Sequence, residues 1–174
     1  MNKNEELLPY YEKAKERLNY DPKTGVFSRY LKLFNKHKEV GNIANHGYMR
    51  VGINLNGIQR SILLHRLAWY IHYGSLPNII DHIDGDVLNN SIKNLRSCTQ
   101  QQNTYNRKIR KDNKTGYKGV SWSPRLNKWY SQIQIKGEKM HLGCYDSMSD
   151  AIKAYEYKAE ELFGEFKRNK GEEL

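Results

Sequence analysis

The sequence predicts an α+β protein with two small domains joined by a basic linker. Short runs of alternating apolar and polar residues recur along the 174-residue chain and are typical of strands. Between residues 107 and 114 the composition changes abruptly to five cations and one acid, without apolar periodicity. We therefore divide the chain into residues 1–106, a linker at 107–115 and a second domain at 116–174, a size that suits two compact domains.

The overall composition indicates a polyanionic partner. The formal net charge is +10 and the isoelectric point is about 9.5, and neutralising phosphates releases counterions and drives association. Cys98 and Cys144 lie far apart without a CxxC motif, which indicates neither a zinc knuckle nor a disulfide framework. The polar amino end does not resemble a signal peptide, and no apolar run reaches the roughly 18 residues of a membrane span. We expect an intracellular protein.

The amino-terminal region predicts a helix and a strand. Residues 9–19 suit a short charged helix, with Pro9 in its first turn. The segment "DPKTG" at residues 21–25 is typical of a turn, and alternation from Val26 to Arg29 predicts a strand after it.

A hairpin and a helix are expected next. Val51, Ile53 and Leu55 alternate with small or polar residues, Asn56-Gly57 is typical of a two-residue hairpin turn, and residues 58–64 suit the returning strand. The following segment, "LLHRLAWYIHYG", has apolar residues at helical spacing and ends at Gly74.

The segment at residues 78–103, "NIIDHIDGDVLNNSIKNLRSCTQQQN", carries the chemistry. It predicts a strand, a long polar loop, a short returning strand and the start of a helix. A neutral imidazole such as His82 can take a proton from water near pH 7. Such a unit can bring Asp81 on the strand and Asn103 on the helix to one point, and hard oxygen ligands favour magnesium or manganese.

Several nearby side chains have more ordinary interpretations. Asp84 and Asp86 suit a loop, and His65 is better explained as a buried structural histidine than as a ligand. Arg66 and Arg96 could contact phosphates, but a solvated or capping role is equally plausible.

The second domain predicts three strands and a helix. The strands fall within "YKGVSW", "KWYSQIQIK" and "KMHLGCY", and the helix follows Ser147, which with Asp150 resembles a capping box, and ends at Gly164. Side chains alternate along a strand, so a helix-facing row and an outward row are expected. The helix-facing row is Trp129, Ser131, Ile133 and Ile135, and the outward row is Tyr130, Gln132, Gln134 and Lys136.

Charge in this domain is divided between faces. Residues 115–174 carry ten cations and nine acids, but six of the acids lie on or beside the helix. The strands carry Lys118, Lys128, Lys136 and Lys139, with Arg125 in the loop between them. A basic sheet face can enter the major groove of DNA, where Gln reads adenine and Lys reads guanine.

The segment at residues 78–103 resembles the HNH nuclease motif, the ββα-metal fold, in the form found in phage and intron-encoded homing endonucleases. "DHIDGD", "NNSIKNLR" and the closing asparagine occur in the family's order and spacing, and "YDPKTGVF", "GYMRVGI" and "HRLAW" are also similar. The resemblance implies a ββα-metal core at 79–106, with an amino-terminal β-rich extension, within an HNH domain at 1–106. It implies His82 as the general base and Asn94 as the residue that fixes the loop. It assigns Asp81 and Asn103 to one divalent metal ion, magnesium or manganese.

The second domain resembles the apetala/ethylene-response-factor DNA-binding domain of plants, which is also appended to phage HNH enzymes. Its glycine and tryptophan framework, "GYKGVSW…NKWYSQI…HLGCYDSMSDAIKAY", carries the likeness. It predicts a three-stranded antiparallel sheet packed on one helix. The DNA contacts implied by the likeness or by the outward row are Lys118, Ser121, Arg125, Tyr130, Gln132, Gln134, Lys139 and His141; in the linker we add Arg107, Lys108, Arg110 and Lys111.

These observations together predict a metal-dependent DNA endonuclease, a hydrolase of phosphodiester bonds, at or near a recognised duplex site. We expect double-stranded DNA as partner, no membrane association, no protein partner, a monomer rather than a dimer, and a cytoplasmic location in a phage-infected or bacterial host cell. The first alternative is a non-catalytic DNA-binding regulator on a retained nuclease frame. A second is an RNA-binding protein, for which basic faces would serve equally well.

Overall fold

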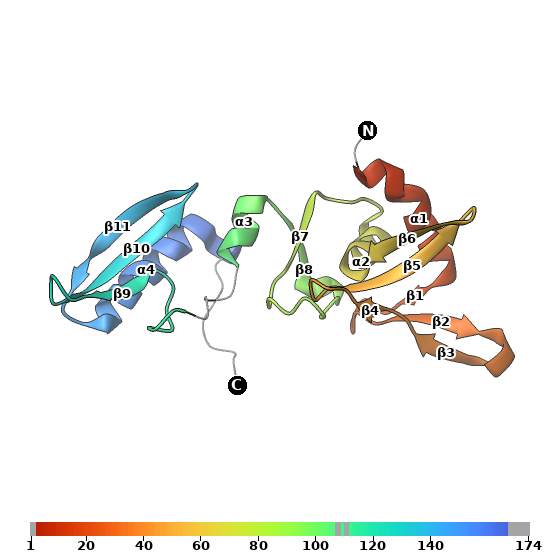
Figure 1. The fold of residues 1–174 in the computed structure, drawn as a ribbon, viewed down its shortest axis with the longest axis horizontal. Coiled ribbons are helices and arrows are strands. Elements are labelled where there is room, and N and C mark those ends of the chain that lie inside the picture. Colours follow the sequence, from red (N-terminus) through yellow and green to blue (C-terminus); the bar gives the residue numbers. More distant parts are fainter. Residues whose placement is uncertain (1–2, 107–108, 110–111, 167–174) are drawn as a thin grey trace. The chain divides into compact units, whose positions relative to one another are not determined.

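The computed structural model describes residues 3–106, 109 and 112–166 (Figure 1). The chain divides into two compact units, Met1–Thr99 and Gln100–Leu174. Both contain helices and strands, which confirms the mixed composition that the sequence predicts.

A three-stranded antiparallel sheet and two helices form the centre of the first unit. The strands are β4 (Asn42–Ile43), β5 (Met49–Leu55) and β6 (Ile58–Leu63), in that order. The expected turn joins β5 to β6, with Asn56 and Gly57 at φ 51° and 80°, the left-handed values that a tight hairpin turn requires.

The two helices pack on this sheet and on each other. They are α1 (Lys3–Arg17) and α2 (Leu64–Tyr73), which follows β6 directly and ends at Gly74. Tyr11 and Ala14 of α1 and Leu67 and Ala68 of α2 are buried in the shared core. The start of α1 was predicted at residue 9; the helix begins earlier, because Leu7 also packs against the core and Pro9 lies inside the helix.

A second sheet carries an exposed hairpin. It contains β1 (Asn19–Tyr20), β2 (Phe27–Leu31) and β3 (Lys36–Glu39), with a 3-10 turn, η1 (Lys32–Phe34), between the last two. Phe27 is buried and stacks on Tyr20, with ring centroids 4.6 Å apart. Beyond Phe27 the hairpin extends away from the core (Figure 1).

The remaining elements of the first unit form a two-stranded hairpin. Strand β7 (Ile79–His82) pairs antiparallel with β8 (Leu95–Cys98), and a 3-10 turn, η2 (Ile92–Asn94), precedes β8. A polar loop connects His82 to η2, in the place that the sequence predicts.

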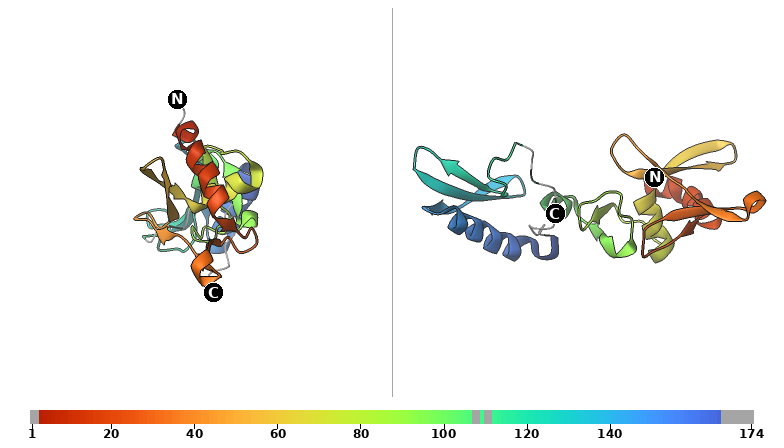
Figure 2. Two further views of the ribbon diagram at one scale, coloured as in Figure 1. Left: turned by 90° about the vertical axis from the view of Figure 1, so that its right-hand side faces the viewer. Right: turned by 90° about the horizontal axis from the view of Figure 1, so that it is seen from below.

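In the second unit one helix covers a face of a three-stranded antiparallel sheet (Figure 2). The strands are β9 (Val120–Ser123), β10 (Lys128–Ile135) and β11 (Glu138–Tyr145), with β10 in the centre. Helix α4 (Met148–Phe163) begins after Ser147, whose hydroxyl accepts from the Ser149 N–H, and ends at Gly164. Ala151 and Ala159 are fully buried, which allows α4 to approach the sheet closely.

A short helix, α3 (Gln100–Tyr105), also belongs to the second unit. The Tyr105 ring stacks on Phe163 with centroids 3.6 Å apart, next to η3 (Gly164–Phe166). The structural division therefore lies at 99/100, whereas the sequence pattern placed the domain boundary at 106/107. An aromatic contact between residues far apart in the chain accounts for the difference.

Candidate active site

The β7–β8 hairpin pairs an acid with a base at its centre. Asp81 and Arg96 are register partners, and Arg96 donates to Asp81 Oδ2 from Nε at 2.9 Å, with Nη2 2.8 Å from the same oxygen. Their side chains are 7% and 12% exposed, so the charge-assisted contact is shielded from solvent. The sequence left the role of Arg96 open; in the structure this residue orients the Asp81 carboxylate.

His82, the last residue of β7, lies among aromatic side chains. Its ring centroid is 5.2 Å from that of His65 and 6.0 Å from that of Tyr48, and the residue is 3% exposed. His82 Nε2 lies 3.3 Å from Asn90 Oδ1. An amide oxygen only accepts hydrogen bonds, so this contact favours the tautomer with the proton on Nε2 and the lone pair on Nδ1.

Burial keeps both histidines neutral. It lowers the pKa of His82 below the ordinary 6.5, although the bond to Asn90 and the nearby carboxylates of Asp84 and Asp81 act in the opposite direction. Burial, assisted by the neighbouring His82, lowers the pKa of His65 to about 3. At pH 7 the imidazole of His82 is therefore in the form that can accept a proton from water. His65 is buried, as predicted for a structural histidine, and its Nδ1 has no hydrogen-bond partner in the described part of the chain.

Asn94 closes the loop that follows His82. Its Nδ2 donates to Asp84 Oδ1 at 2.9 Å and to the Asn89 carbonyl at 2.8 Å, while its Oδ1 accepts from the Asp84 N–H at 3.0 Å. Its backbone carbonyl accepts from the Ile83 N–H at 2.8 Å. Burial alone would raise the pKa of Asp84, but hydrogen bonds from Asp86, Asn89 and Asn94 outweigh it and lower that pKa. The loop is therefore held by its own polar side chains.

The "DPKTG" turn supports the same loop from the amino-terminal side. The Tyr20 hydroxyl donates to the Asn90 carbonyl at 2.8 Å, and the Ile92 N–H donates to the Pro22 carbonyl at 3.0 Å. Gly25 has φ +77°, and a Cβ placed there would lie 2.4 Å from the carbonyl carbon of Asn90. Only glycine allows this approach, and it fixes the backbone that presents Asn90 to His82.

Asn103, the other expected metal ligand, lies on α3 and is half-buried. No group of three or more His, Cys, Asp or Glu side chains among the described residues could hold a metal ion. Magnesium, however, commonly uses one or two protein oxygens and keeps several waters. The carboxylate of Asp81 and the amide oxygen of Asn103 match this preference, and neither supplies the thiolate or imidazole that zinc favours.

Six of the predicted DNA contacts share one face of the second unit's sheet. In the register, Tyr130 is opposite Ser121, Gln132 opposite His141, and Gln134 opposite Lys139. Paired residues of antiparallel strands point to the same side, and Ser131 and Ile133 between them are buried under α4. The rings of Tyr130 and His141 stack with centroids 4.6 Å apart. We call these residues the sheet face: Ser121, Tyr130, Gln132, Gln134, Lys139 and His141.

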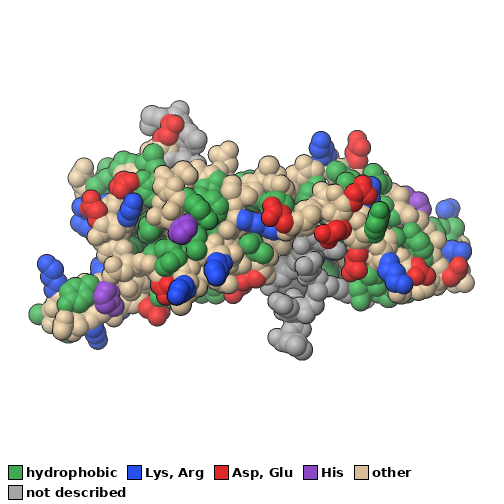
Figure 3. Space-filling model, turned by 180° about the vertical axis from the view of Figure 1, so that it is seen from behind, with side chains coloured by type: hydrophobic (Ala, Val, Ile, Leu, Met, Phe, Trp, Pro, Cys, Tyr) green, Lys and Arg blue, Asp and Glu red, His purple; other side chains and the backbone are tan. Residues whose placement is uncertain are grey.

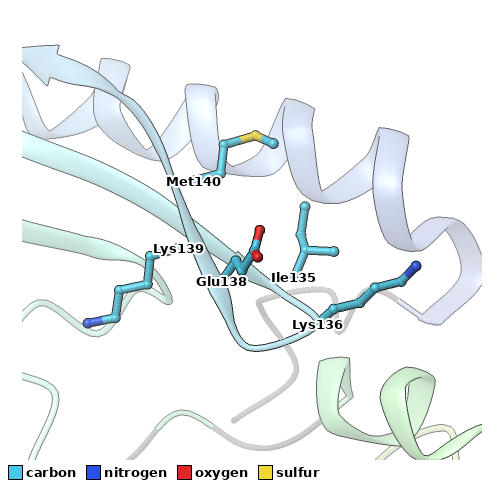
Figure 4. A pocket seen from close by; sticks show the side chains of 5 residues that line it. All are labelled: Ile135, Lys136, Glu138, Lys139 and Met140. Atoms are coloured by element: carbon cyan, nitrogen blue, oxygen red, sulfur yellow. The ribbon is translucent and has the colours of Figure 1, made fainter.

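Other predicted contacts are placed differently. Lys118 is half-buried, and its Nζ donates to the Tyr105 carbonyl at 2.8 Å. Arg125 is exposed in the turn between β9 and β10. Lys136 was expected in the outward row, but β10 ends at Ile135 and Lys136 has φ 51° in the turn. It lines a pocket with Lys139, and the two side chains point in opposite directions (Figure 4). Arg107, Lys108, Arg110 and Lys111 lie outside the described residues.

Three residues around His82 were missed by the sequence analysis or given no role in the site. Asn90 bonds the imidazole, and Tyr48 and His65 pack against its ring. Asn90 stood in a run of similar amides, and the other two lie far away in sequence. One sequence signal was available for Tyr48: it falls within "GYMRVGI", a segment that resembles the same enzymes.

Comparisons with known proteins agree with this geometry. The model of the HNH endonuclease family matches residues 63–105, which include His65, β7, β8 and α3. Protein 3.8 of Escherichia phage T7 is 34% identical over 107 residues, which are 60% of this chain and 87% of that protein. The uncharacterized HNH endonuclease L560 of Acanthamoeba polyphaga mimivirus is 36% identical over 106 residues, 59% of this chain and about half (54%) of the length of L560.

Among solved structures, the HNH homing endonuclease I-HmuI is similar at 24% identity, with 84% of this chain and 77% of that chain covered. Its TM-score of 0.41 is too low for this likeness to carry an argument. The family match and the extensive coverage of the phage relative are sufficient. The chain belongs to the HNH endonuclease family.

Proposed function

We propose that the protein is a metal-dependent DNA endonuclease of the homing-endonuclease type, which hydrolyses phosphodiester bonds at or near a recognised duplex site. The observation that carries the proposal is the buried His82 at the end of β7, held by Asn90 in the tautomer with a basic Nδ1. Membership of the HNH endonuclease family supports the same reaction.

In this proposal His82 takes the proton from the attacking water as its oxygen approaches the phosphorus. Asn94 acts indirectly, because its bonds to Asp84 and Asn89 hold the loop that positions Asn90. Asp81 and Asn103 would hold one magnesium or manganese ion, and a bound ion would stabilise the charge of the phosphate and the departing oxygen. Arg96 keeps the Asp81 carboxylate in a single orientation. The strand–loop–strand–helix order of β7, β8 and α3 supports a ββα-metal core.

Recognition in this proposal is assigned to the sheet face, supplemented by Arg125 and the linker. The sheet of three antiparallel strands with one helix supports an apetala/ethylene-response-factor-like module. Amides and a lysine beside stacked rings suit the edges of bases in the major groove. The similarity to a phage protein supports a target in the cytoplasm of an infected or bacterial cell.

The first test removes the imidazole. We expect His82→Ala to lower the cleavage rate of supercoiled plasmid DNA with magnesium or manganese by about 10²–10⁴-fold, the usual contribution of a general base. DNA affinity, measured by fluorescence anisotropy, should change by no more than a few-fold. His72→Ala is the control, because His72 is exposed on α2. Unchanged cleavage by His82→Ala would remove the residue from this role.

The second test concerns the metal ion. Asp81→Asn keeps the shape of the side chain but removes its charge, so we expect a higher magnesium concentration at half-maximal rate and a lower maximal rate. Asn103→Ala should act in the same direction, and Asn103→Asp should restore activity because it restores an oxygen donor. Cleavage that persists in excess chelator would contradict metal dependence. Tight binding without scission under any divalent ion would favour the regulator.

A further inference from the structure

The exposed part of the β2–β3 hairpin, residues 28–38, has features that folding does not explain. We call this segment the arm. Leu33 and Phe34 in η1 are 88% and 64% exposed, and Tyr30 is 45% exposed. Large apolar side chains at such exposure cost solubility without contributing to a core. Figure 3 shows hydrophobic and basic side chains together at the end of the molecule that this hairpin forms.

The arm is also strongly cationic. It contains four cations, Arg29, Lys32, Lys36 and Lys38, and no acid. All four are exposed, and none forms an ion pair with another described residue. Arg29 and Lys38 are direct register partners on adjacent strands, and like charges in that position destabilise a sheet. Lys36, the partner of Leu31, points to the same face of the hairpin.

Internal contacts give the arm a defined conformation despite its exposure. The Tyr30 hydroxyl donates to Asn35 Oδ1, and Asn35 adopts the left-handed conformation that closes the turn, with φ 46°. The Tyr30 and His37 rings pack with centroids 5.3 Å apart, and Lys36 Nζ lies 5.7 Å from the centre of the Phe34 ring. The cations are therefore presented on a preformed scaffold.

We propose that the arm is a second DNA-binding element of this protein, which rests on the proposed nuclease function. Arg29, Lys36 and Lys38 bind phosphates of the duplex backbone. Leu33 and Phe34 enter the minor groove at the tip, where apolar side chains can press between base steps. A polyanion would remove the repulsion between Arg29 and Lys38, which an uncharged protein surface would leave in place.

The place of the arm in the first unit determines which part of the DNA it contacts. The tip lies at the end of this unit that is remote from β7 and β8 in both Figure 1 and Figure 2. The phosphates that it binds are therefore away from the bond beside His82. The arm should contribute to affinity and to the length of protected DNA and should leave the chemical step unchanged.

The test uses the full-length double variant Arg29→Gln/Lys38→Gln and a labelled random-sequence duplex of about 40 base pairs. Each phosphate contact contributes about 0.9 to the slope of log affinity against log salt concentration. We expect the slope to become shallower by about 1.8 and binding at moderate salt to weaken by about tenfold or more. Thermal stability should stay equal or rise, because a like-charge pair has been removed.

The matched control is Lys15→Gln/Arg17→Gln, which removes two exposed cations from α1. An unchanged salt slope in the arm variant, or an equal loss in the control, would overturn the proposal. The tip is tested by Leu33→Ser/Phe34→Ser, which should weaken binding without changing the slope. Sedimentation of the wild type and the tip variant covers the other occupant: a wild-type dimer that dissociates in the variant would make the arm a self-association surface instead.

Failure of the arm and failure of the nuclease can be told apart. If no divalent ion supports nicking but the arm variant still loses affinity and salt dependence, the arm proposal stands and the nuclease proposal fails. If His82→Ala abolishes nicking but the arm variant binds like the wild type, the opposite holds.

Discussion

A single imidazole, that of His82, concentrates the chemistry of this protein, and its properties arise from what surrounds it. The Asn90 amide selects its tautomer, while burial lowers its pKa. His65 stays neutral beside it because a second positive charge in the same buried space would be costly. The pair of histidines is therefore compatible with a base at neutral pH.

Acid should weaken the fold through His65. Its pKa is about 3 in the folded protein and about 6.5 unfolded, so the unfolded chain binds more protons between these values. The stabilisation is complete above pH 6.5 and is lost as pH falls towards 3, at about 1.4 kcal/mol per pH unit. We expect His65→Phe to flatten the fall in the free energy of unfolding, measured by urea denaturation at pH 7, 6 and 5. Equal slopes in both proteins would contradict this account.

The loop between β7 and β8 depends on an element far away in sequence. Its own asparagines hold it internally, but the turn that contains Gly25 contacts its backbone directly. Replacing Gly25 therefore tests whether the position of the loop matters for cleavage.

Gly25→Ala should lower both stability and the cleavage rate at saturating DNA. A left-handed conformation costs a non-glycine residue about 1–2 kcal/mol, and here the added Cβ must also displace the Asn90 backbone at 2.4 Å. Gly57→Ala is a matched control, because Gly57 has φ +80° but no atom within 4 Å of its Cβ position. The control should lose stability by the first cost alone and keep its rate. Equal rates for the two variants would mean that the loop tolerates the shift.

Local signals predicted the elements, whereas long-range contacts determined the details of the site. Asn56-Gly57, Ser147 and Gly164 act within a few residues, and each ends or begins an element where expected. The pairing of Arg96 with Asp81, the contact of Asn90 with His82 and the packing of α3 on Phe163 depend on residues brought together by the fold. No periodicity encodes such contacts, so the sequence could name Asp81 and His82 but not their partners.

At the scale of the whole molecule, cationic surfaces are distributed along the chain. The arm belongs to the first unit and the sheet face to the second, with a basic linker in the sequence between them. Modules joined by a short chain act at high effective concentration, so each can bind modestly while the protein binds well. The described residues include no helix long and apolar enough to cross a membrane.

Site choice should depend on the sheet face and cleavage should not. We expect the triple variant Gln132→Ala/Gln134→Ala/Lys139→Ala to lose preferred cut positions on genomic DNA, mapped by sequencing of ends, and to keep metal-dependent nicking of plasmid DNA. Each lost base contact costs about 1–3 kcal/mol of discrimination. Lys153→Ala/Glu156→Ala on the exposed side of α4 is the control. Undiminished preference in the triple variant would move recognition elsewhere.

The close approach of Gly25 to Asn90 also bears on how such an enzyme can be rearranged by recombination. A catalytic hairpin whose backbone rests on a turn near the amino terminus is not a portable cassette. Transplanting it without residues 20–25 would deliver the histidine but leave its support behind, so functional chimaeras should keep the first unit intact and exchange what lies beyond it.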